Sequence, residues 1–175
     1  KKLDIIISMN RFPNLIRPSH LLATLFGIGL LPLAPGTWGS LFGLILFLYS
    51  EIYLSINEEK FYFLLILIIF SSFVICYFAT KGLENHEKDQ KSIVIDELAG
   101  MWVALIPVAG IISMREVIIC SFLAFLFFRI FDIWKPYPID VVDRKLKNYF
   151  GVVVDDLIAG VYAAIAVYLI SLLFL

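Results

Sequence analysis

The sequence predicts an all-α membrane protein, a polytopic helix bundle with about five spans and a short N-terminal interfacial or re-entrant helix. Of its 175 residues, 61% are hydrophobic, and the mean hydropathy is +0.94. Soluble domains carry roughly 45–50% apolar residues, so lipid is the expected solvent. Several charge-free stretches are long enough to cross a hydrocarbon core about 30 Å thick. We expect residues 1–175 to form a single membrane-embedded domain.

The charge-free stretches locate the spans. The longest, from Pro18 to Ser50, is interrupted by clustered prolines and glycines, which stop helices. We therefore expect His20 to Leu31 to form the short interfacial or re-entrant segment, followed by a loop over 32–40. The first span should begin near Thr37 or Ser40. The five predicted spans cover residues 38–56, 61–80, 95–113, 117–134 and 154–174.

The basic residues predict the orientation of the bundle. Successive connecting regions, from the N-terminus to the C-terminus, contain 4, 1, 3, 1, 4 and 0 lysines and arginines. Basic residues favour the cytoplasmic side, so the N-terminus is expected in the cytoplasm. Four segments then deliver polar residues to the cytoplasmic leaflet.

Acidic residues dominate these cytoplasmic ends. Carboxylates near a membrane are costly unless they are paired, hydrated or bound to metal. Arg129 and Lys135 are the nearby cations in the sequence, so a converging acidic group would keep excess negative charge. A hard divalent cation such as Mg²⁺ is the simplest compensation, and it indicates phosphate chemistry at a lipid surface. The five carboxylates are Asp96, Glu97, Asp132, Asp155 and Asp156.

Two of the acidic segments resemble each other. In both Ile93–Gly100 and Val152–Gly160, two acidic residues precede an Ala-Gly pair by a few positions. Small residues allow membrane helices to approach closely. Two parallel helices packed at these positions would bring their carboxylates together.

The loop 32–40 has the features of a phosphate-binding segment. It offers free backbone N–H groups, including that of Gly36, the hydroxyls of Thr37 and Ser40, and a following helix N-terminus. Signatures of covalent phosphatases, such as Cys-x5-Arg or Asp-x-Asp, do not occur in the sequence. Metal-assisted attack by water is therefore favoured over a covalent route.

Other interpretations stay open at this point. Acidic residues at helix starts complement the helix dipole, Arg129 and Asp132 could pair on one helix face, and Lys135 could extend to lipid head groups. A small transporter or channel with a carboxylate-lined cation site is the main functional alternative. A structural subunit of a membrane assembly is another. The net charge of −1 gives no basis for a nucleic-acid partner.

The sequence contains four blocks in order: Leu31–Ser40, Ile93–Gly100, Phe128–Ile139 and Gly151–Gly160. Together they resemble the motif set of bacterial phosphatidylglycerophosphatase A. The resemblance implies a Mg²⁺-dependent phosphatase of the inner membrane. Its substrate would be a phospholipid in the bilayer, phosphatidylglycerophosphate, and its products phosphatidylglycerol, a cardiolipin precursor, and inorganic phosphate.

The resemblance also suggests roles for the site residues. The five carboxylates would hold Mg²⁺, and one of them would act as general base for the attacking water. Arg129 and Lys135 would neutralise the phosphoryl oxygens in the transition state. Gly36, Thr37 and Ser40 would surround the phosphate.

Overall fold

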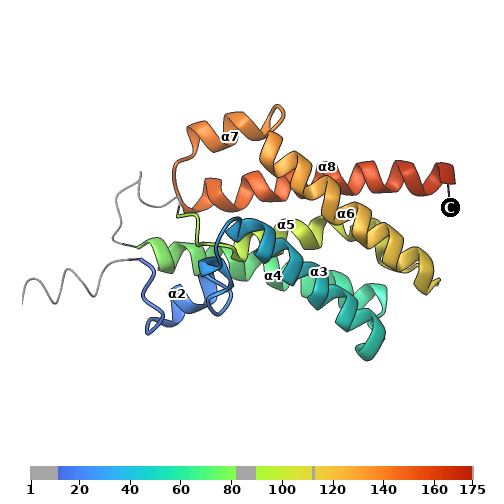
Figure 1. Ribbon diagram of the computed structural model, residues 1–175, viewed down its shortest axis with the longest axis horizontal. Coiled ribbons are helices and arrows are strands. Elements are labelled where there is room, and N and C mark those ends of the chain that lie inside the picture. Colours follow the sequence, from blue (N-terminus) through green and yellow to red (C-terminus); the bar gives the residue numbers. More distant parts are fainter. Residues whose placement is uncertain (1–11, 82–89, 112, 175) are drawn as a thin grey trace, which may run out of the picture.

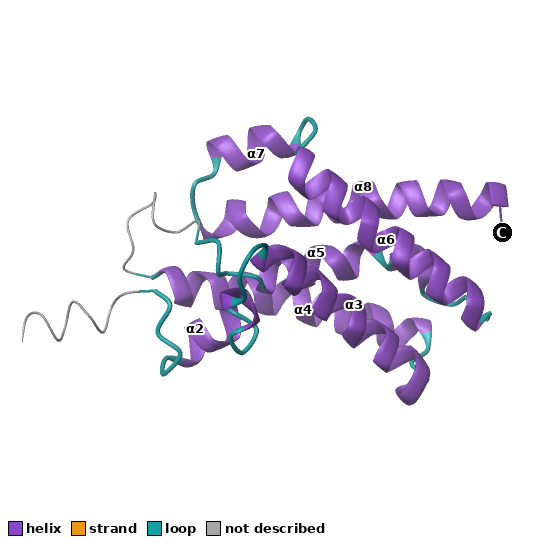
Figure 2. Cartoon of the chain, viewed as in Figure 1, coloured by secondary structure: helices purple, strands orange, loops and turns teal. Residues whose placement is uncertain are grey.

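The computed structural model describes residues 12–81, 90–111 and 113–174, and within these ranges all regular structure is helical. Figures 1 and 2 show the helices gathered into one elongated bundle. Lys1, Lys2, Arg11 and Lys88, which contribute to the predicted orientation, lie outside the described residues. The helices are α2 (Pro18–Ala23), η1 (Ile28–Leu30), α3 (Pro35–Leu54), α4 (Glu58–Thr80), α5 (Ile95–Ala104), η3 (Ile106–Val108), α6 (Met114–Trp134), α7 (Ile139–Lys145) and α8 (Tyr149–Phe174).

Four of these helices, α3, α4, α6 and α8, are long and apolar enough to cross a membrane. They have 20, 23, 21 and 26 residues and match four of the predicted spans to within a few residues. Many of their large apolar side chains are exposed on the outside of the bundle, where lipid would cover them. The prediction of a polytopic all-α membrane protein is confirmed.

The segment predicted as a span over 95–113 is instead a short, fully enclosed helix. α5 has ten residues, and all ten are buried. At 1.5 Å per residue it is about 15 Å long, which is too short to cross a bilayer. Pro107, in the 3₁₀ turn η3, cannot continue an α-helix. α5 packs against α3, α4 and α8 and lies in the middle of the bundle (Figure 1).

α5 and α8 touch through their glycines, as the two similar sequence segments predict. A Cβ added to Gly160 would lie 2.3 Å from the carbonyl oxygen of Gly100. A Cβ added to Gly100 would lie 2.7 Å from the carbonyl oxygen of Asp156. The two backbones are therefore in direct contact, and both helices begin at the same end of the bundle (Figure 1).

The segment before α3 differs from the predicted loop over 32–40. α3 already begins at Pro35, because proline fits the first helical position, where its missing N–H is not needed. The loop therefore ends at Ala34. Upstream, the predicted segment His20–Leu31 forms α2 and η1, and the N–H of Val94 donates to the carbonyl of Ala23 at 2.9 Å. This bond ties the N-terminal segment to the start of α5.

Candidate active site

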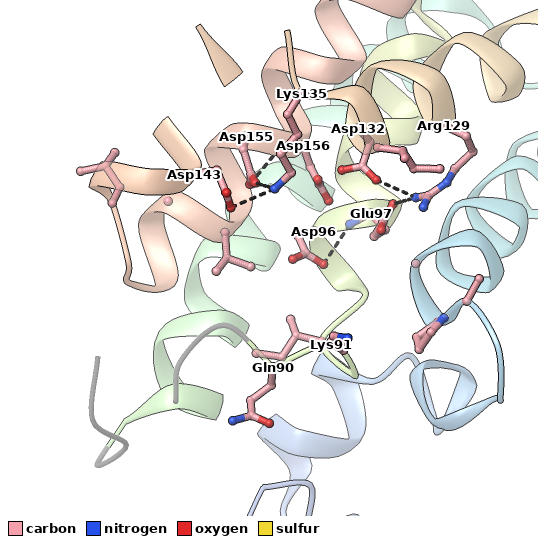
Figure 3. A pocket seen from close by; sticks show the side chains of 18 of the residues that line it. Gln90, Lys91, Asp96, Glu97, Arg129, Asp132, Lys135, Asp143, Asp155 and Asp156 are labelled. Carbon is pink, nitrogen blue, oxygen red and sulfur yellow. Dashed lines mark hydrogen bonds and ion pairs between the residues drawn. The ribbon is translucent and has the colours of Figure 1, made fainter. Parts of the chain in front are cut away.

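A cavity of about 690 Å³ opens at the end of the bundle where α3, α5 and α8 begin and α6 ends. This volume is typical of small-molecule sites. All five predicted carboxylates line it, together with Gly36, Arg129 and Lys135 (Figure 3). The sequence-based expectation that these distant segments converge is confirmed.

Three carboxylates form the centre of this cavity. Glu97 of α5, Asp132 of α6 and Asp156 of α8 each place one oxygen within 4.8 Å of the others. The guanidinium of Arg129 holds two of them, with Nη1 lying 2.5 Å from Glu97 Oε2 and 3.1 Å from Asp132 Oδ2. We refer to Glu97, Asp132 and Asp156 as the carboxylate triad. Since each member comes from a different helix, the triad depends on how α5, α6 and α8 pack together.

The charge balance of the cavity fits a hard divalent cation. Its lining contains six carboxylates but four basic side chains. Arg129 neutralises part of the triad, whereas Asp156 forms no ion pair within the described residues. Mg²⁺ binds carboxylate oxygens about 2.1 Å away and usually keeps several waters. Oxygens from three acidic side chains in this spacing suit such an ion.

The other two predicted carboxylates lie beside the triad in different environments. Asp155 is bound by Lys135, whose Nζ lies 2.8 Å from Asp155 Oδ2. Asp96 accepts a hydrogen bond from the backbone N–H of Glu97, with Oδ1 at 3.0 Å. The single group of five metal ligands in the sequence-based hypothesis thus divides into a triad and two neighbours.

Asp143 of α7 is a site residue that the sequence analysis missed. Its Oδ1 lies 2.9 Å from Lys135 Nζ, so Lys135 bridges Asp143 and Asp155. Burial alone would lower the pKa of Lys135, but the hydrogen bonds and charges of Asp155 and Asp143 raise that pKa above its ordinary value. The amine therefore stays protonated. One sequence signal was available: Asp143 lies in the link between two helices that both carry site residues.

The backbone of Lys135 supports a functional role for its side chain. Lys135 ends α6 with φ of 47°, in the left-handed region where glycine is the usual helix-ending residue. This conformation costs a residue with a side chain roughly 1–2 kcal/mol. A lysine at such a position is explained by the two carboxylates that its amine reaches.

The start of α3 lies directly against the triad. A Cβ on Gly36 would overlap the carboxylate of Glu97, so a larger residue here would displace the Glu97 side chain from its contact with Arg129. Ser40, one turn later, is buried and donates from Oγ to Glu97 Oε2 at 2.8 Å. It supports Glu97 but does not line the cavity.

Thr37, predicted to surround the phosphate, is not among the residues that line the cavity. Because residues 35–40 are helical rather than an open loop, Thr37 lies about 100° around the helix from Gly36. The backbone at Gly36 is the part of this segment that reaches the cavity.

Fold and site together define a multi-pass membrane protein with a carboxylate-rich, cation-suited cavity at one end of its helix bundle. The family model for phosphatidylglycerophosphatase A matches residues 21–171. The chain belongs to this family and is a phosphatase.

Individual relatives agree with this assignment. A phosphatidylglycerophosphatase A of Haemophilus influenzae is 42% identical over 159 residues, which cover 90% of this chain and 91% of the relative. The Escherichia coli protein of the same name is 37% identical over 155 residues, which cover 88% of this chain and 84% of that relative. A candidate phosphatidylinositol-3-phosphatase of Bacteroides thetaiotaomicron is 33% identical over 157 residues, which cover 86% of this chain and 94% of that relative. No solved structure gives a significant match.

Proposed function

We propose that this protein hydrolyses the terminal phosphate monoester of phosphatidylglycerophosphate, giving phosphatidylglycerol and inorganic phosphate. The observation that carries the proposal is the convergence of Glu97, Asp132 and Asp156 in the cavity of a phosphatidylglycerophosphatase A family member. The positive-inside pattern further supports a bacterial inner-membrane protein with its cavity on the cytoplasmic side.

In this proposal the carboxylate triad would hold Mg²⁺, and Asp96 lines the same cavity. When bound, the ion supplies Lewis-acid stabilisation of the phosphoryl oxygens. The positive charges of Arg129 and Lys135 bind the same phosphate and orient it. The backbone at Gly36 allows the phosphate to approach the triad, because no side chain blocks the way.

We assign Asp96 as the general base. It lines the cavity, is buried, and forms no ion pair within the described residues, in contrast to Glu97, Asp132 and Asp155. Its carboxylate would take a proton from the attacking water as the new P–O bond forms and the ester P–O bond breaks. The leaving alkoxide of the glycerol head group is then protonated from solvent.

The transporter or channel alternative gains no support. Carrier sites lie near the bilayer midplane and open alternately to both sides. The five carboxylates instead share a cavity at one end of the bundle.

Substrate comparison tests the proposed function. The purified protein in mixed micelles with Mg²⁺ is expected to release phosphate faster from phosphatidylglycerophosphate than from phosphatidylinositol 3-phosphate or phosphatidic acid. The second lipid is included because of the Bacteroides relative. Faster release from phosphatidylinositol 3-phosphate, or none from phosphatidylglycerophosphate, would contradict the proposal.

Asp143 should act through Lys135. Asp143→Asn is expected to lower kcat about 5- to 10-fold, because Lys135 Nζ loses one of the two carboxylates that direct it. In a Lys135→Met background the same substitution should have no further effect, since coupled residues are not additive.

Asp140→Asn provides the matched control for Asp143. Asp140 lies on the same helix, pairs with Arg144 and does not line the cavity. Steady-state phosphate release from all four variants measures the coupling. If Asp143→Asn lowered kcat by the same factor in the wild-type and Lys135→Met backgrounds, Asp143 would not act through Lys135.

A further inference from the structure

The rim of the cavity is divided into an apolar edge and a basic edge. Four lining residues are exposed: Ala34, Ile133, Lys91 and Lys147. Ala34 immediately precedes α3, and Ile133 lies in the last turn of α6. Lys91 precedes α5, and Lys147 follows α7. A lipid phosphate has the same division, with a charged head group joined to apolar chains.

The apolar edge continues a membrane-facing stripe on α6. Ile133 is 73% exposed. Large exposed apolar side chains precede it along α6 at three- and four-residue intervals, which places them on one helix face. Arg129 and Asp132, which bind and surround the phosphate site, lie within one turn of Ile133. A lipid whose acyl chain lay along this stripe would therefore have its head group beside the triad. The stripe consists of Ile119, Phe122, Leu126, Ile130 and Ile133.

The α3 side of the same edge presents an apolar side chain at a conformational cost. Leu33, just before α3, has φ of 78° and a fully exposed side chain. A left-handed backbone is energetically unfavourable for a residue with a branched side chain. Outward-pointing side chains gain little packing within the protein, whereas contact with lipid tails would offset the cost. Leu33 adjoins Ala34, so this surface reaches the cavity.

We propose that the lipid substrate enters the cavity sideways from the bilayer, between the start of α3 and the end of α6. Its acyl chains lie against Ile133 and Leu33, while its terminal phosphate faces Arg129. The inference rests on the proposed function and adds to it the direction of approach and the surface that binds the diacylglycerol part. We call this surface, Leu33, Ala34 and Ile133, the lipid entrance.

Kinetics with two substrates test the lipid entrance. Ile133→Gln is expected to lower kcat/KM for dioleoyl phosphatidylglycerophosphate about 10-fold, because a polar group replaces an apolar contact. Hydrolysis of the deacylated head group, glycerophosphoglycerol phosphate, should stay within about 2-fold of wild type. Equal losses with both substrates would overturn the proposal.

Phe150→Gln is the matched control. Phe150 lies in the first turn of α8, at the same end of the bundle, and is exposed, but it packs against Phe73 of α4 and does not line the cavity. It should leave both rates unchanged. A loss of diacyl-lipid hydrolysis in Phe150→Gln without one in Ile133→Gln would move the entrance to the α4–α8 side and overturn the proposal.

Photocrosslinking gives an answer that does not depend on turnover. Benzoylphenylalanine is placed at position 133 or 150 in an Asp132→Asn background, and radiolabelled dioleoyl phosphatidylglycerophosphate is added in detergent. An adduct at position 133 that excess unlabelled lipid suppresses supports the lipid entrance. An adduct at 150 alone, or equal unsuppressed labelling at both positions, overturns it. Failure of the proposed function would be seen separately, as absence of phosphate release by the wild-type protein.

Discussion

Asp132→Asn is expected to reduce phosphate release by roughly 100- to 1000-fold while the protein still inserts and folds. The substitution removes one negative oxygen from the carboxylate triad and one ion pair from Arg129, the charged groups on which phosphate stabilisation would depend. Asparagine has nearly the same shape as aspartate, and Arg129 keeps its contact with Glu97. The fold should therefore persist.

Steady-state phosphate release at increasing Mg²⁺ measures this effect. The half-saturating Mg²⁺ concentration should rise at least about 10-fold, because a weakened ligand set binds the ion less tightly. Asp140→Asn, outside the cavity, should match wild type in both quantities. Size-exclusion profiles in detergent test folding. Near wild-type turnover in Asp132→Asn would remove the triad from the mechanism.

Chelation of divalent cations by EDTA should reduce phosphate release by on the order of 100-fold or more, with recovery when Mg²⁺ is returned in excess. Without a cation, the cavity lining carries more carboxylates than basic groups, and it would repel a phosphate dianion. Arg129 offsets this repulsion little, because its charge is already shared between Glu97 and Asp132.

A chelator titration with phosphatidylglycerophosphate in nonionic mixed micelles measures the dependence. Arg129→Lys provides a useful comparison, since it preserves the charge but loses the forked geometry of the guanidinium. That variant should lower the rate yet keep the requirement for Mg²⁺. Full activity in EDTA, after removal of tightly bound ions by dialysis, would show that the triad serves another purpose.

Much of the fold and the site could be predicted from the sequence because membranes impose simple rules. Uncharged stretches locate α3, α4, α6 and α8, and acidic groups at their ends are costly enough to indicate function. The Ala-Gly pairs predict the contact between α5 and α8, since bare backbone permits close packing.

The remainder depends on tertiary structure that local pattern does not encode. Hydropathy cannot distinguish α5, an apolar helix enclosed by protein, from one that faces lipid. Asp143 joins the cavity because α7 folds back over the start of α8, so its contact with Lys135 depends on how that link turns. The division of five carboxylates into a triad and two neighbours likewise depends on side-chain directions rather than on spacing.

The contact between α5 and α8 has a consequence for biogenesis. α8 follows α5, α6 and α7 in the chain, and the contact between Gly100 and Gly160 requires both backbones to be present. A nascent polypeptide that has inserted only through α6 thus still lacks Asp155 and Asp156. If the carboxylates of α8 serve the proposed reaction, hydrolytic activity would therefore appear only after α8 has been synthesised and packed against α5.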